Sequence, residues 1–185
     1  MNLVQIGTNI ANDDFYRIVT KLNKEDIKNL ILVEPLKSCN LNIENCYKNY
    51  KYILENVVIN LDSSVHSETF FVSKYNWLSS LTKEHIEKHK TNETPTEIKI
   101  DAITLDNLFR KYNLTEVDIL FIDCEGKDDE IIKSINFDEF NIKNIYYEHA
   151  HINNEELIQF LNKKNYTVNK TNFSDGLTSL AVKLN

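Results

Sequence analysis

The N-terminal stretch Leu3-Val4-Gln5-Ile6-Gly7-Thr8-Asn9 decides the fold. A short apolar run that ends in glycine is typical of a buried strand turning tightly into a helix, because glycine lets the backbone approach a ligand where a Cβ would collide. About one helix further on, Val33-Glu34-Pro35 ends a second apolar run in a carboxylate. In nucleotide-binding α/β folds, an acid at this second strand tip accepts ribose hydroxyls. The two runs therefore predict a site for an adenosine-containing ligand.

The glycine content of the first turn narrows the choice of ligand. A pyrophosphate needs a Gly-x-Gly-x-x-Gly turn, whereas Gly7-Thr8-Asn9-Ile10-Ala11 contains one glycine. The sequence also lacks the Gly-x-x-x-x-Gly-Lys-Ser/Thr loop that cradles a triphosphate. S-adenosylmethionine has no phosphate, and its sulfonium cation suits an acidic turn, so it is the expected cofactor. A nicotinamide-dependent oxidoreductase is the less favoured alternative.

Length, charge and cysteine spacing limit the class of protein. The chain has 185 residues and a net charge of -7, and its lysines are scattered among acids, which disfavours a nucleic-acid substrate. Cys39, Cys46 and Cys124 lack the spacing of a disulfide framework or zinc site. No signal-peptide pattern and no membrane-spanning apolar run is present. We expect one domain over 1–185, located in the cytoplasm, with no membrane partner.

Alternating apolar runs and helical periodicities predict a parallel sheet with right-handed crossovers. A helix is expected over about 13–23, and strands are expected at 30–33, 57–60, 117–122, 145–147, 166–168 and 177–184, the last two as an antiparallel edge pair. Between them, an irregular insertion at about 62–99 holds a short strand at 69–72, a polar helix at 83–90 and Trp77. This insertion is either a solvated loop or a lid over the substrate.

Polar groups follow five of the predicted strands, at the edge where α/β sheets bind ligands. They are Gln5 to Asn9, Glu34, Asn60, Asp123 to Gly126 and Glu148 to His151. Several of these runs, together with Thr104-Leu105-Asp106 and Ile131-Ile132-Lys133-Ser134-Ile135, resemble the FkbM family of methyltransferases across almost the whole chain. The run Ile122-Asp123-Cys124-Glu125-Gly126 is the most specific piece. Ala11 stands where that family usually has a second glycine, and Gln5 replaces a frequent acid.

The resemblance implies a Rossmann-like class I methyltransferase fold, with a mostly parallel central sheet, an antiparallel edge strand and helices on both faces. It also implies O-methylation of a hydroxyl on a sugar, glycan or related small molecule. We expect Gly7 to admit the methionine end of the cofactor, Glu34 to take the ribose and Asn60 to lie near adenine. The full set of expected cofactor-binding residues is Gln5, Gly7, Thr8, Asn9, Glu34, Pro35, Asn60 and Asp123. A methyltransferase-like module that binds a partner without catalysis is the main alternative.

A hydroxyl acceptor must lose its proton, so a general base is expected. His149 is one candidate because imidazole titrates near neutral pH, Asp123 is another, and Glu125 would bind substrate hydroxyls. A structural role for His149 and a helix-terminal role for Glu125 are equally open. The set Asp123, Glu125, Asp128, Glu148, His149 and His151 could hold a hard cation. However, we expect Asp128 and Asp129 to be solvent-exposed charges in the first turn of a helix, and His151 to be exposed. No metal is therefore expected.

Overall fold

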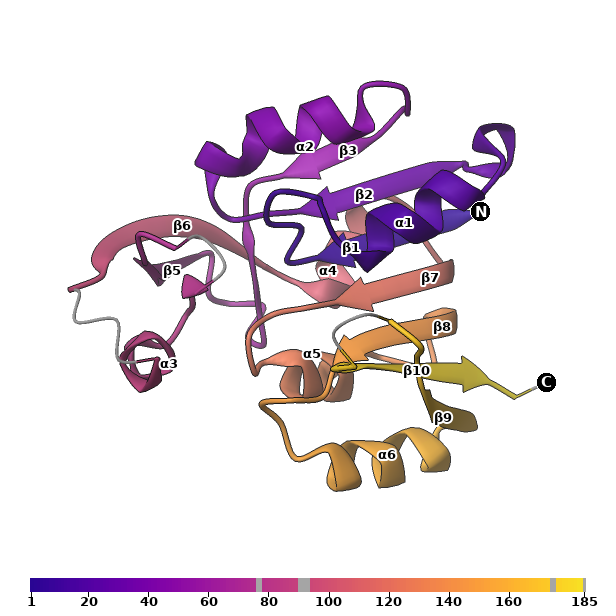
Figure 1. Cartoon of the computed structure of the whole chain (residues 1–185). Helices are drawn as coiled ribbons and strands as arrows, with labels where there is room; N and C mark the ends of the chain where they lie inside the picture. The colour runs from indigo at the N-terminus through magenta and orange to yellow at the C-terminus, as the bar shows by residue number, and fades with distance from the viewer. Residues whose placement is uncertain (76–77, 90–93, 174–175, 185) are drawn as a thin grey trace.

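A seven-stranded sheet with helices on both faces forms the centre of the computed structural model, which describes residues 1–75, 78–89, 94–173 and 176–184 (Figure 1). The strand order is β3-β2-β1-β7-β8-β10-β9. Neighbours from β3 to β8 are parallel, whereas β10 is antiparallel to both β8 and β9. The strands are β1 (Asn2–Ile6), β2 (Asn29–Val33), β3 (Ile53–Glu55), β7 (Glu116–Ile122), β8 (Asn141–Glu148), β9 (Tyr166–Lys170) and β10 (Thr178–Lys183). The predicted α/β class and antiparallel edge are confirmed.

Two apolar clusters lie on opposite faces of this sheet. Successive strand residues point to opposite faces, so Leu3 belongs to one cluster and Val4 to the other. The helices follow the same division, because Phe15 of α1 packs with Leu3, and Leu108 of α4 packs with Val4. The helices are α1 (Asp14–Lys21) and α2 (Asn40–Tyr47) on the first face, and α4 (Leu105–Lys111), α5 (Asp128–Ser134) and α6 (Asn154–Lys163) on the second, with η1 (Lys24–Asp26) and η2 (Lys37–Cys39) as short connecting turns.

A second, three-stranded sheet lies beyond the carboxyl ends of the main strands (Figure 1). It consists of β4 (Val58–Asn60), β6 (Thr96–Thr104) and β5 (Ser67–Val72), in that order. Strand β6 is parallel to β4 and antiparallel to β5. The helix α3 (Lys83–Lys88) lies beside this small sheet. The strand and helix predicted inside the 62–99 insertion are therefore present, and they stand next to the predicted ligand-binding edge.

The structure corrects the predicted third strand. The run at 57–60 forms β4 of the small sheet, and the main sheet instead continues through β3. That strand has three half-buried residues, too few to give a clear apolar pattern. Strand β6 was not predicted, although its alternating sequence Thr96-Glu97-Ile98-Lys99-Ile100 is typical of a half-buried strand. Trp77 lies outside the described residues. None of the described helices has the length and apolar character needed to cross a bilayer.

Candidate active site

A cavity opens between the tips of β1, β2 and β7 and the small sheet. Strand β1 is the point where strand order reverses, since β2 and β7 flank it on either side, and ligands of open α/β sheets bind at such a point. The main sheet contributes Gly7, Asn9, Glu34, Pro35, Asp123 and Glu125, and the other side contributes Val58, Ile59, Phe70, Ser80 and Leu81.

The turn after β1 depends on Gly7 for a reason that the sequence alone does not show. Gly7 has φ +82°, and a Cβ at this position would lie 1.9 Å from the carbonyl oxygen of Asp123. The missing side chain therefore lets the β1 turn pass against the end of β7. Ala11, with φ +60°, also lies in the left-handed region. For an L residue this conformation costs about 1–2 kcal/mol, so the backbone at Ala11 is strained.

Glu34 joins the turns after β1 and β2. Its Oε2 accepts a hydrogen bond from the Asn9 amide at 2.7 Å, and its Oε1 accepts one from the Leu36 amide at 2.8 Å. Burial raises the pKa of this carboxyl, and the two amides oppose the rise. A carboxylate has about four acceptor sites, so Glu34 can hold these amides and still accept hydrogen bonds from a ligand in the cavity that it lines.

Three residues predicted to bind the cofactor have side chains that hydrogen-bond within the protein. Gln5 donates from Nε2 to Oδ2 of Asp13 at 2.5 Å, and Thr8 donates to the carbonyl of Val33 at 3.3 Å. Asn60 is 5% exposed and donates to the backbone carbonyls that follow β4. None of the three is among the described residues that line the cavity, whereas Gly7, Asn9, Glu34, Pro35 and Asp123 are.

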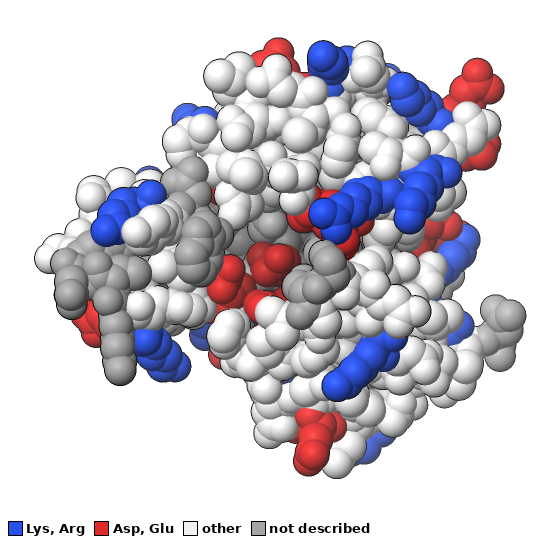
Figure 2. Space-filling view, viewed as in Figure 1, with Lys and Arg blue, Asp and Glu red and all other residues white. Residues whose placement is uncertain are grey.

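Carboxylates gather at the β7 side of the cavity, where Figure 2 shows acidic groups in the hollow at the centre of this face. Asp123 is exposed and lines the cavity. The protein atoms packed near its carboxyl group, followed by the charge of Asp128, raise the pKa of this group well above the usual range. Burial also raises the pKa of Glu125 to about 8, with the charge of Glu148 adding to the effect.

Asp128 ties the ends of β7 and β8 together. Its Oδ1 accepts from the Glu148 amide at 3.0 Å, and its Oδ2 accepts from the Cys124 amide at 3.1 Å. The residue is fully buried, and burial raises its pKa to about 7. The expectation that Asp128 is a solvent-exposed charge at the start of a helix is therefore wrong. Its carboxylate is buried and accepts hydrogen bonds from two backbone amides.

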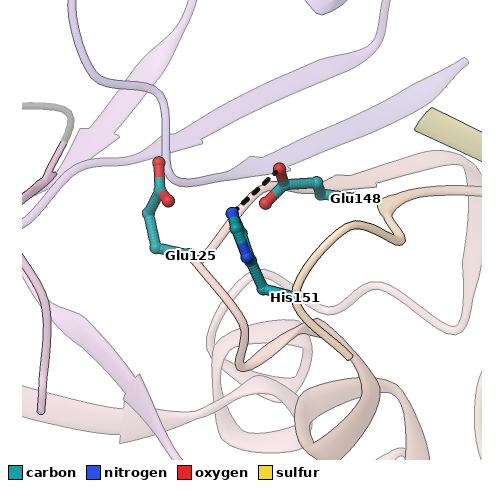
Figure 3. A group of neighbouring side chains, drawn as sticks. All are labelled: Glu125, Glu148 and His151. Carbon is teal, nitrogen blue, oxygen red and sulfur yellow. Dashed lines mark ion pairs between the residues drawn. The ribbon is translucent and has the colours of Figure 1, made fainter. Parts of the chain in front are cut away.

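The histidines near the cavity have different surroundings. Nδ1 of His149 is 3.0 Å from Oγ of Ser179 on β10. His149 is not among the described residues that line the cavity. His151 is exposed, as expected, but its ring approaches Glu125 and Glu148 (Figure 3). Nε2 of His85, on α3, is 3.3 Å from Oε2 of Glu125. Sequence reasoning missed His85, although its partner four residues on, His89, offered a signal, since such pairs share a helix face.

The comparisons with known proteins decide the family. A family model described as the methyltransferase FkbM domain matches residues 5–168. The chain belongs to the FkbM methyltransferase family. The crystal structure of methyltransferase FkbM from Methylobacillus flagellatus KT is similar to this FkbM domain, with a TM-score of 0.54 and 12% sequence identity. The alignment covers 98% of this chain and 43% of that one, so the chain spans less than half of that neighbour. No match was found among curated proteins.

Family membership and the similar fold agree with the arrangement of the cavity. The sequence-based assignment to FkbM is confirmed by the family match. The strand order and the antiparallel β10 are those of a methyltransferase fold, as the similarity in structure indicates. This FkbM chain is thus a methyltransferase domain whose cavity lies at the switch point of its sheet.

Proposed function

We propose that this FkbM domain is an S-adenosylmethionine-dependent O-methyltransferase that acts on a hydroxyl of a sugar, glycan or related small molecule. The observation that carries the proposal is the convergence of Gly7, Glu34 and Asp123, from three neighbouring strand tips, on one cavity. A single glycine in the first turn suits a ligand without a pyrophosphate. The acidic character of the cavity suits a cationic cofactor and a hydroxyl-rich acceptor.

Residues on both sides of the cavity fit the cofactor. Glu34 would accept the ribose hydroxyls, with Asn9 and Pro35 beside it. The apolar side chains of Ile59 and Phe70, on the small sheet, offer a surface for an aromatic base. When bound, the cofactor supplies an electrophilic methyl group. Its sulfonium charge is favourable near the carboxylates of β7.

The side chains at the β7 tip fit the chemistry of a hydroxyl acceptor. Methyl transfer is an in-line displacement, so holding the acceptor oxygen in place supplies much of the acceleration. Asp123 is open to the cavity and is placed to take the proton that the hydroxyl loses. Glu125 lies two residues further along the same turn and also lines the cavity, where it would bind substrate hydroxyls. His149, bonded to Ser179, is a weaker candidate for the base.

Replacing Glu34 tests the cofactor assignment. We expect Glu34→Ala to weaken binding of S-adenosylhomocysteine by about 1.5–3 kcal/mol, because a charge-assisted hydrogen bond to the ligand is lost. Isothermal titration calorimetry measures this change. Glu44→Ala, an exposed acid on α2, is the matched control and should bind as the wild type does. Urea unfolding of the variant separates lost binding from lost structure, since Glu34 also holds two amides. Unchanged affinity would show that the ribose assignment is wrong.

The same titration separates the alternatives. Saturable binding of S-adenosylhomocysteine without methyl transfer to any of a panel of monosaccharides and methyl glycosides would favour a partner-binding module. Saturable binding of NADH, followed by its fluorescence, would favour an oxidoreductase. A wild-type protein that binds no S-adenosylhomocysteine would overturn the proposal altogether.

A further inference from the structure

Glu125, Glu148 and His151 meet beside the cavity, although they come from two separate strand ends. Each offers one ligand atom, and the three atoms lie within 4.8 Å of one another. Figure 3 shows the imidazole of His151 pointing into the space between the two carboxylates. Nε2 of His151 is 4.0 Å from Oε1 of Glu148. The three groups therefore surround a small space that one ion could fill.

His85 supplies a second, independent observation. Its side chain is 9% exposed, and its Nε2 is buried without a hydrogen-bond partner. That nitrogen lies 3.3 Å from Oε2 of Glu125. Two ligands of a tetrahedral ion with bonds of 2.0–2.2 Å lie roughly 3.3–3.6 Å apart, so this spacing is compatible with a shared ion. The rings of His85 and His151 are 5.8 Å apart, which places both imidazoles around the same carboxylate.

The charges around this cluster call for a cation. Asp123, Glu125 and Asp128 follow β7 and Glu148 ends β8, and Asp128 holds the two segments together through the amides of Cys124 and Glu148. Lys127 also lines the cavity, but its ammonium group pairs with Glu130 at 2.9 Å. A cation bound beside these carboxylates would relieve their mutual repulsion.

The donor set indicates which cations fit. Mg²⁺ and Ca²⁺ take oxygen ligands, whereas imidazole nitrogen with carboxylate oxygen suits divalent ions such as Mn²⁺, Fe²⁺ and Zn²⁺. We propose that Glu125, Glu148 and His151 bind one divalent transition-metal ion, with His85 as the fourth ligand. The ion joins the ends of β7 and β8 to α3.

Metal titration of the untagged full chain tests this site without cofactor or substrate. We expect one Mn²⁺ per chain by electron paramagnetic resonance of the free ion, and one Zn²⁺ per chain by calorimetry. Loss of a ligand should weaken binding by at least about tenfold, since even outer-shell changes cost 10- to 100-fold. His151→Ala and Glu125→Gln should both show this loss. His85→Ala should show it too, because a buried neighbour that merely packs would leave affinity unchanged.

His66→Ala is the matched control, because His66 is exposed and lies outside the cluster. It should bind both metals as the wild type does. His151 is exposed, so its replacement should leave the fold intact, and circular dichroism checks this. Absence of saturable binding, or equal affinities in the wild type and His151→Ala, would overturn the proposal. Metal binding that persists in a protein with no affinity for S-adenosylhomocysteine would overturn the proposed methyl transfer alone.

Discussion

Replacing Gly7 with alanine is expected to lower the free energy of unfolding by about 2–5 kcal/mol, through overpacking and a strained φ together. The added Cβ would lie 1.9 Å from the Asp123 carbonyl oxygen, so the backbone of β1 or β7 must move. Such movement opens the contact that forms the floor of the cavity. We therefore expect Gly7→Ala to lose both stability, measured by urea unfolding, and binding of S-adenosylhomocysteine.

Gly176→Ala separates the two causes. Gly176 also has a positive φ, +66°, but a Cβ there meets no atom within 4 Å. The free energy of unfolding of this variant should fall only by the cost of the backbone conformation, about 1–2 kcal/mol. Its affinity for S-adenosylhomocysteine should not change. Equal losses of stability in the two variants would contradict the close approach of the β1 turn to Asp123.

Local sequence patterns were sufficient to predict the inner strands of the main sheet, but not its edge strand β3. The apolar runs around Val4, Ile31 and Leu120 each form a strand buried on both faces, and such strands read as continuous apolar segments. Because parallel strands present their carboxyl ends at one edge, the polar residues after them could be expected to gather there. Gly7, Glu34 and Asp123 do line one cavity.

Hydrogen bonding could not be predicted in the same way. Gln5 and Thr8 stand in the same motif as Gly7, yet their side chains bond to Asp13 and Val33 inside the fold. A motif shows which residues are near a site, but it does not show which of two possible partners a side chain takes. Asn60 illustrates a second limit, because its strand pairs with β6 across a sequence separation of about forty residues.

The cluster of histidines and carboxylates was the feature that the sequence predicted least well. Glu125, Glu148 and His151 were candidates among a larger polar set, but nothing local showed that they converge. His85 comes from α3, in the segment that was expected to be irregular, and it reaches Glu125 through tertiary packing. The expectation of no metal rested on treating these side chains separately. Their arrangement in space is what motivates the proposed ion.

Asp123→Asn is expected to reduce methyl transfer by about 10²–10⁴-fold, the usual contribution of a general base. Asparagine has nearly the same shape, so the cavity should keep its form and S-adenosylhomocysteine should bind with little change in affinity. Formation of S-adenosylhomocysteine from S-adenosylmethionine, with a panel of monosaccharides and methyl glycosides, measures turnover. Calorimetry on the same variant measures cofactor affinity.

His149→Ala is the comparison that assigns the base. Because the His149 ring bonds to Ser179 on β10 and does not line the described cavity, this variant should retain most of the turnover. A large loss in His149→Ala with normal turnover in Asp123→Asn would move the base to the histidine. If Asp123→Asn instead loses cofactor affinity in proportion to turnover, Asp123 binds the cofactor and takes no proton. Retained affinity with lost turnover leaves proton transfer as the role of this carboxylate, because position and shape are preserved and only its charge and basicity are removed.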